Sequence, residues 1–118
     1  DALTSRKIQK PDFISLHLYR SLDDYTQVCD DFYNEFKLPI WVTEFAPIHG
    51  TKTESKILSW FTETISKFDS NPHIQRYAYF GSGCTDALRK VAVFTEGDIT
   101  DIGHFYFHNT HKEYIIRF

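Results

Sequence analysis

Strand-like and helix-like segments alternate along the first two thirds of the chain, and this order constrains the fold more than any other feature of the sequence. β-Branched and aromatic residues mark three strand segments, residues 12–19, 40–45 and 73–81. Apolar residues recur at helical spacing in the two segments between them. Strands separated by helices join through right-handed crossovers into a parallel sheet. The sequence therefore predicts an α/β fold with parallel strands.

The two helix segments carry start and stop signals. The first, residues 21–37, is followed by Pro39, which cannot continue a helix. The second is expected to begin at Thr51, because Glu54 three residues later completes a capping box, and to end at the "SNP" of residues 70–72. The apolar stripe of the second helix consists of Ile57, Leu58, Phe61, Ile65 and Phe68.

The pattern weakens after residue 84. Residues 87–94, "ALRKVAVF", fit either a strand or a short helix. We interpret the stretch from His104 to Glu113 as an aromatic strand or a loop. The two cysteines fit a disulfide or two free thiols; Cys29 lies on the apolar stripe of the first helix and is expected to be a buried thiol, while Cys84 could pair elsewhere in a complete protein.

The charge and length of the chain exclude several classes of protein. The 118 residues carry a net charge of -3, which argues against a nucleic-acid partner, because a polyanion requires a basic face. No apolar run approaches the length that spans a bilayer, so we expect no membrane partner. The chain is at most one domain. It contains no Met, and we expect it to be processed, excised or incomplete.

A single carboxylate interrupts the second strand segment, which reads "PIWVTEFA" over residues 39–46. Glu44 lies at the carboxyl end of this strand, where parallel α/β sheets bind their ligands. His17 and Tyr19 end the first strand, and Tyr79 and Phe80 end the third. We therefore expect a carboxylate, an imidazole and several aromatic rings at one rim of the sheet. The alternative is that Glu44 only marks the exit of the strand into solvent.

Strand alternation predicts which side chains share a face of the sheet. On the first strand His17 and Tyr19 share a face with Phe13 and Ser15, opposite the aliphatic residues. On the second strand alternation places Glu44 on the face of Ile40 and Val42, and we expect Trp41, on the other face, to pack against a helix. On the third strand either Tyr77 and Tyr79 or Ala78 and Phe80 point inward.

Three stretches of the sequence resemble a known enzyme family. They are "DFISLHLY" at residues 12–19, "PIWVTEFA" at residues 39–46 and "RYAYFGS" at residues 76–82, and "GDITDIGHFYF" at residues 97–107 extends the match. In order and spacing these stretches resemble the C-terminal end of glycoside hydrolase family 128, the fungal and bacterial endo-β-1,3-glucanase type among the clan A barrels. The resemblance covers nearly all of the chain.

The resemblance implies a fold and an activity. Residues 1–118 would form about three βα units, the sixth to eighth strands, of the catalytic (β/α)8 TIM barrel of a glycoside hydrolase. Such a barrel takes roughly 250 residues, so the part that carries the family's acid/base glutamate is missing from this chain. We expect this chain alone to be inactive, a fragment of a retaining hydrolase that acts on β-1,3-glucan.

The resemblance also implies roles for the site residues. Glu44 matches the nucleophile, and a retaining glycosidase places its second carboxyl about 5–5.5 Å from that group. His17, Tyr19, Tyr79 and Phe80 would bind the β-glucan substrate, a polysaccharide or oligosaccharide. No cofactor is implied, and the family resemblance implies an extracellular or cell-wall location.

Other interpretations of these residues stay open. Core packing explains Tyr79 and Phe80 as well as sugar stacking does. His104, His108, His111 and Glu113 do not have the spacing of a recognised closed metal site, so we expect no metal. The chain could instead be a non-catalytic carbohydrate-binding or interaction remnant of the same fold. It could also be an independent small α/β domain with no link to sugars.

Overall fold

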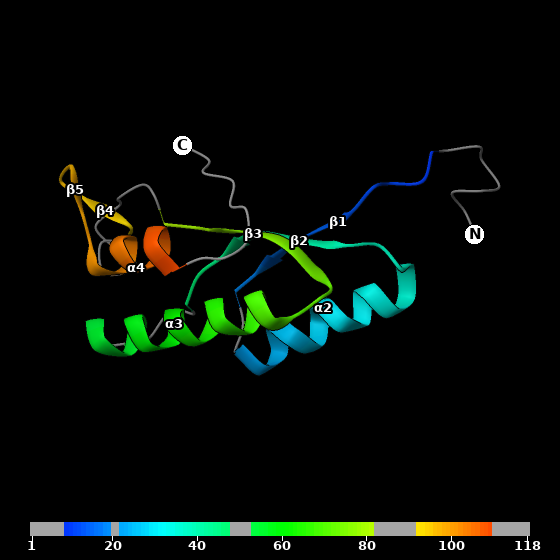
Figure 1. Ribbon diagram of the computed structural model, residues 1–118, viewed down its shortest axis with the longest axis horizontal. Coiled ribbons are helices and arrows are strands. Elements are labelled where there is room, and N and C mark those ends of the chain that lie inside the picture. Colours follow the sequence, from blue (N-terminus) through cyan, green and yellow to red (C-terminus); the bar gives the residue numbers. More distant parts are fainter. Residues whose placement is uncertain (1–8, 20–21, 48–52, 82–91, 110–118) are drawn as a thin grey trace.

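Three parallel strands and the two helices that connect them form the main part of the molecule. The computed structural model describes residues 9–19, 22–47, 53–81 and 92–109 (Figure 1). The elements of this part are β1 (Ile14–Leu18), α2 (Leu22–Phe36), β2 (Ile40–Phe45), α3 (Glu54–Ser70) and β3 (Ile74–Tyr79). The strands pair in parallel in the order β1-β2-β3. The α/β fold predicted from the alternating pattern is therefore confirmed.

The two helices cover one face of the sheet. Figure 1 shows α2 and α3 side by side beneath the strands. The side chains between this helix layer and the sheet form the core. Phe45 is fully buried at the centre, with its ring centroid 5.0 Å from that of Phe68 and 5.3 Å from that of Tyr79. Tyr77 is also buried beside Phe68. Tyr77 and Tyr79 thus point toward the helices, which leaves Ala78 and Phe80 on the other face.

A register shift in β2 decides where Glu44 points. Leu16 pairs with Val42, but the next residue of β1, His17, pairs with Glu44, so Thr43 is the extra residue of a β-bulge. Val42 and Phe45 are both fully buried on the helix side, three residues apart rather than two. The predicted face of Glu44 was therefore wrong. Simple alternation groups it with Val42, whereas the bulge turns it to the face of His17.

The face opposite the helices carries successive layers of side chains from adjacent strands. At the start of the strands Phe13 stacks on Trp41 with ring centroids 3.8 Å apart, and the Arg76 guanidinium lies 4.6 Å from the Trp41 ring. Farther along, the hydroxyls of Ser15 and Thr43 lie 2.6 Å apart. The prediction that Trp41 packs against a helix was wrong, because it lies on this open face with Phe13.

The cap of α3 differs from the expected one. Thr53 has an extended backbone, with φ -133° and ψ 148°, and its hydroxyl accepts a hydrogen bond from the Lys56 backbone N–H at 3.4 Å. Thr53 is therefore the N-cap, and the helix does not begin at Thr51, which lies outside the described residues. Asn71 caps the other end, as the "SNP" signal predicted.

The C-terminal part forms a hairpin and a helix rather than the aromatic strand or loop that we expected. Strands β4 (Phe94–Thr95) and β5 (Asp98–Ile99) pair antiparallel and lead into α4 (Asp101–Asn109). The Thr100 hydroxyl accepts a hydrogen bond from the Gly103 N–H at 3.1 Å and caps this helix. Most of the ambiguous segment 87–94 lies outside the described residues.

Cys29 is a buried free thiol, and burial, with the nearby Asp30 charge as a lesser cause, raises its pKa to about 12. Cys84 lies outside the described residues. None of the helices in the described ranges is long and apolar enough to cross a membrane.

Replacing Phe68 by Ala should destabilise the fold strongly. The Phe68 ring is 0% exposed and contacts Tyr25, Phe45 and Tyr77. Its removal leaves a cavity under the sheet and should lower the free energy of unfolding by about 3–5 kcal/mol. Phe36→Ala is the control, because Phe36 is 47% exposed. Urea denaturation measures both, and equal losses would contradict this description of the core.

Alkaline pH should destabilise the protein through its buried tyrosines. Burial, and then the hydrogen bond that the Tyr77 hydroxyl donates to Asp69 at 2.9 Å, raise the pKa of Tyr77 above its ordinary value. The folded chain therefore holds this proton more tightly than the unfolded chain. The stabilisation is complete below about pH 10 and falls as the pH rises further. Urea denaturation between pH 8 and 11 should show this loss, and Tyr77→Phe should make the alkaline slope shallower. An unchanged slope would contradict it.

Candidate functional site

The carboxyl ends of β1 and β2 bring three polar side chains together. The Tyr19 hydroxyl donates a hydrogen bond of 2.6 Å to Glu44 Oε2. His17 Nδ1 lies 3.3 Å from the same oxygen. Parallel pairing of His17 with Glu44, one step past the bulge, creates this arrangement. The predicted grouping of a carboxylate and an imidazole at one rim is present in the structure.

The Glu44 carboxylate is accessible but held. Its side chain is 33% exposed, so a ligand can reach it from the open face. The two neighbours act on a single oxygen, Oε2, and leave Oε1 without a partner among the hydrogen bonds and ion pairs of the described residues. One oxygen is thus fixed by the protein while the other is presented outward.

The Tyr19 phenol stays protonated and remains a donor. Burial is the main cause that raises the pKa of Tyr19, and the hydrogen bond to Glu44 and the negative charge of that carboxylate raise it further. A deprotonated phenol beside this carboxylate would place two negative charges in contact. Tyr19 therefore orients the carboxylate by donating a hydrogen bond and keeps its proton.

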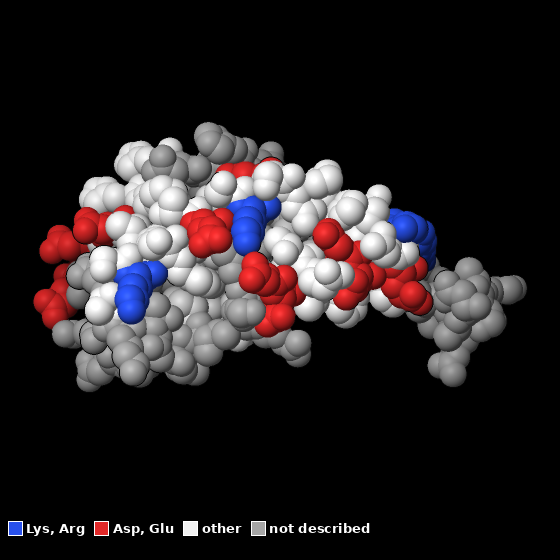
Figure 2. Space-filling view, turned by 90° about the horizontal axis from the view of Figure 1, so that it is seen from below, with Lys and Arg blue, Asp and Glu red and all other residues white. Residues whose placement is uncertain are grey.

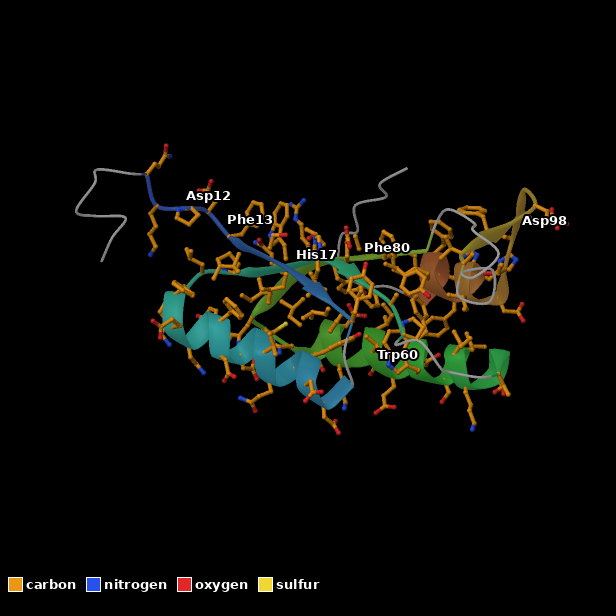
Figure 3. The ribbon with its side chains drawn as sticks, turned by 180° about the vertical axis from the view of Figure 1, so that it is seen from behind. Asp12, Phe13, His17, Trp60, Phe80 and Asp98 are labelled. Carbon is orange, nitrogen blue, oxygen red and sulfur yellow. The ribbon has the colours of Figure 1, made fainter. Side chains whose placement is uncertain are left out.

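Phe80 extends the rim on the other side of β2. Its backbone N–H donates to the Phe45 carbonyl at 2.9 Å and continues the ladder one residue past β3. Its ring meets Tyr19 edge to face at a centroid distance of 5.9 Å, and the two residues are 44% and 41% exposed. Figure 3 shows Phe80 and His17 on the side of the sheet away from the helices, with Trp60 on the helix side. Tyr19 and Phe80 thus form an exposed aromatic pair next to Glu44.

Tyr79 does not join this group. Its ring packs between the sheet and α3, with the Phe61 centroid 4.8 Å away and the Phe45 centroid 5.3 Å away. Burial raises the pKa of its hydroxyl. Tyr79 and Phe80 are consecutive and point to opposite faces, so only one of them could lie with Glu44. The structure brings His17, Tyr19 and Phe80 to Glu44 and leaves Tyr79 in the core.

Several residues that line the open face were not predicted as site residues. Ser15 and Thr43 form the layer directly beneath Glu44, and the Phe13–Trp41–Arg76 stack lies below them. The bulge that places Thr43 there leaves no local signal in the sequence. Ser15 could have been found, because it alternates with His17 on β1.

The chemistry of the rim is that of one carboxylate with two hydrogen-bonding neighbours. Glu44 is the only acid in the group formed with His17, Tyr19 and Phe80. No group of three or more His, Cys, Asp or Glu side chains is placed to hold a metal in residues 9–19, 22–47, 53–81 and 92–109. Such an arrangement can supply a nucleophile or a base. A reaction that uses a pair of carboxyl groups would need its second carboxyl from outside this group.

Comparison with protein families gives a match over most of the chain. The model described as "Glycosyl hydrolase catalytic core" matches residues 4–106. No sequence among the curated proteins matches the chain.

Solved structures of glycoside hydrolase family 128 (GH128) have the same fold. A GH128 subgroup VII oligosaccharide-binding protein from Cryptococcus neoformans is 29% identical with a TM-score of 0.69, and the alignment covers 89% of this chain and 43% of that one. A subgroup V exo-β-1,3-glucanase from the same organism is 25% identical with a TM-score of 0.75, covering 89% and 48%. A subgroup I endo-β-1,3-glucanase from Amycolatopsis mediterranei, in complex with laminaritriose and laminaribiose, is 19% identical with a TM-score of 0.74, covering 91% and 48%.

The comparisons confirm the resemblance to GH128 and limit its extent. The chain spans less than half the length of each of these three structures. Its three parallel strands and their helices are a partial match to the GH128 barrel. Because the family model matches residues 4–106 of the 118 residues, the chain belongs to the glycosyl hydrolase catalytic core family.

Proposed function

We propose that the chain supplies one side of the active site of a retaining β-1,3-glucan hydrolase, with Glu44 as the nucleophile. The observation that carries this proposal is the geometry at Glu44 Oε2, which receives the Tyr19 hydrogen bond at 2.6 Å and lies 3.3 Å from His17 Nδ1. A nucleophilic carboxylate must be held in one orientation while an oxygen stays free for attack. Glu44 meets both requirements.

In this proposal residues 1–118 are part of a larger catalytic domain. The strands β1, β2 and β3 correspond to the sixth, seventh and eighth strands of the barrel, and the acid/base glutamate lies on a strand outside this chain. Glu44 attacks the anomeric carbon of the sugar while that second carboxyl protonates the leaving oxygen, and water then releases the glycosyl group. This chain covers less than half of each of the three GH128 relatives, which supports the need for further strands.

The exposed aromatic pair gives the proposal a substrate surface. The rings of Tyr19 and Phe80 can pack against the flat C–H faces of glucose units, and the His17 side chain can hydrogen-bond a sugar hydroxyl. A β-1,3-glucan is the ligand class that these residues would bind, because the relatives include two β-1,3-glucanases. An extracellular or cell-wall location would suit such a polymer.

A second candidate is oligosaccharide binding without hydrolysis. The subgroup VII relative, an oligosaccharide-binding protein, is 29% identical to this chain. The same aromatic pair and the same held carboxylate would then bind a sugar chain, with Glu44 as a hydrogen-bond acceptor. The two candidates differ in whether the Glu44 carboxylate forms a bond to the sugar.

Replacing Glu44 by Gln distinguishes the two candidates. The protein to test is the longest natural product that contains these 118 residues. Under the hydrolase proposal, laminarin hydrolysis should fall by roughly a thousandfold or more, because the amide cannot act as a nucleophile. Laminarin binding should persist. Release of reducing ends measures hydrolysis, and calorimetric titration with laminarihexaose measures binding.

Glu63→Gln is the matched control. Glu63 lies exposed on α3, where its carboxylate pairs only loosely with Lys67 at 3.6 Å, so this variant should hydrolyse laminarin like the parent. If the parent protein binds laminarin without cleaving it, the binding function is correct. If Glu44→Gln cleaves laminarin as fast as the parent, Glu44 is not the nucleophile.

Tyr19→Phe tests how the carboxylate is held. The change keeps the ring but removes the donor to Glu44 Oε2. Loss of a hydrogen bond to a charged group costs about 1.5–3 kcal/mol, so we expect kcat to fall roughly 10- to 150-fold with a smaller change in KM. Steady-state kinetics on laminarin measures both parameters. Tyr33→Phe, on α2, serves as control, and a wild-type kcat in Tyr19→Phe would refute the positioning role.

A further inference from the structure

Two histidines lie one helical turn apart on the exposed side of α4. His104 and His108 are related by i, i+4 spacing, and both are exposed. Their rings are nearly parallel, with an interplanar angle of 10° and centroids 6.1 Å apart. Neither ring makes a hydrogen bond or ion pair with another described residue. Both imidazoles are therefore available to the same external ligand.

The helix that carries the pair is fixed to the rest of the molecule. Ile102 and Tyr106 are buried, and the Tyr106 ring packs on Phe61 of α3 at a centroid distance of 5.7 Å. Gly103 lies so close to the Val93 carbonyl that a Cβ added to it would clash with the carbonyl oxygen. These contacts on one side of α4 leave the other side, with the two histidines, facing outward. The distance between the two imidazole rings is thus set by a helix that packs against the rest of the molecule.

Acidic residues lie near the pair in the described part of the sequence. Residues 92–109 contain three acidic residues, Glu96, Asp98 and Asp101, and no Lys or Arg. All three are exposed, and Figure 2 shows acidic groups at the end of the molecule that carries the hairpin and α4. The helix also ends one residue after His108, and the C-terminus of a helix favours positive charge.

We propose that His104 and His108 form a two-histidine binding site for a divalent transition-metal ion. Neutral imidazole is a ligand for Cu²⁺, Ni²⁺ and Zn²⁺, and two histidines at i, i+4 on one helix face are a known chelating arrangement. Water completes the coordination. Cu²⁺ binds most tightly of the three, because affinity rises along the divalent series to copper. This site is separate from the Glu44 rim and needs no residue of it.

Cu²⁺ alone is the probe for this site. Titration of the 118-residue chain should show one strong Cu²⁺ equivalent, with nitrogen ligation in the electron paramagnetic resonance spectrum. The ion should also raise the helical circular dichroism signal or Tm, because it bridges one turn of α4. His104→Ala and His108→Ala should each weaken binding by at least about tenfold, since either leaves a single ligand. Acidification should release the ion, because protons compete for the imidazoles.

The control is His111→Ala, which removes a histidine near the pair in sequence but keeps the i, i+4 spacing. It should bind Cu²⁺ like the parent chain. Equal binding by His104→Ala, His108→Ala and the parent would overturn the proposal, and so would loss of binding in His111→Ala alone. Circular dichroism of each variant without metal shows whether α4 remains helical. Laminarin hydrolysis is not part of the readout, so failure here leaves the Glu44 proposal intact.

Discussion

The β-bulge at Thr43 is the feature on which the arrangement of this protein depends. If residues 42–45 were paired regularly, without a bulge, strict alternation would place Glu44 on the helix side with Val42 and would turn Phe45 outward. With it, Phe45 fills the centre of the core and Glu44 faces His17. The bulge thus lets Val42 and Phe45 both lie in the core while Glu44 faces His17, which regular alternation over residues 42–45 would not allow. Bulges are known to re-aim side chains next to active sites.

The two faces of the sheet consequently differ: one packs in the core and the other carries the candidate site. The helix side is a continuous aromatic and aliphatic core in which Tyr77 and Tyr79 lie with Phe45. The open side changes along the strands from a stacked Phe13–Trp41 pair, through hydroxyls, to the Glu44 carboxylate at the rim. The Glu44 carboxylate thus lies at the carboxyl ends of the strands, where α/β proteins bind ligands.

The sequence predicted the order and type of the main elements because long periodic segments carry that information. It could not predict the face of Glu44, since a bulge arises from pairing with β1 and leaves no local mark. Trp41 was misplaced for the same reason: its partners Phe13 and Arg76 come from other strands. The helix at α4 was missed because its aromatic residues suit a strand locally, and packing on α3 decides the outcome.

Phe61 connects parts of the molecule that are distant in sequence. Its ring lies 6.2 Å from Phe45, next to Glu44 in the chain, and 5.7 Å from Tyr106 of α4. Close-packed rings transmit displacement rather than absorb it. Variation in the C-terminal helix can therefore reach the strand that carries the carboxylate through one intervening side chain. A substitution in α4 could thus shift the rim without changing any residue of the group around Glu44.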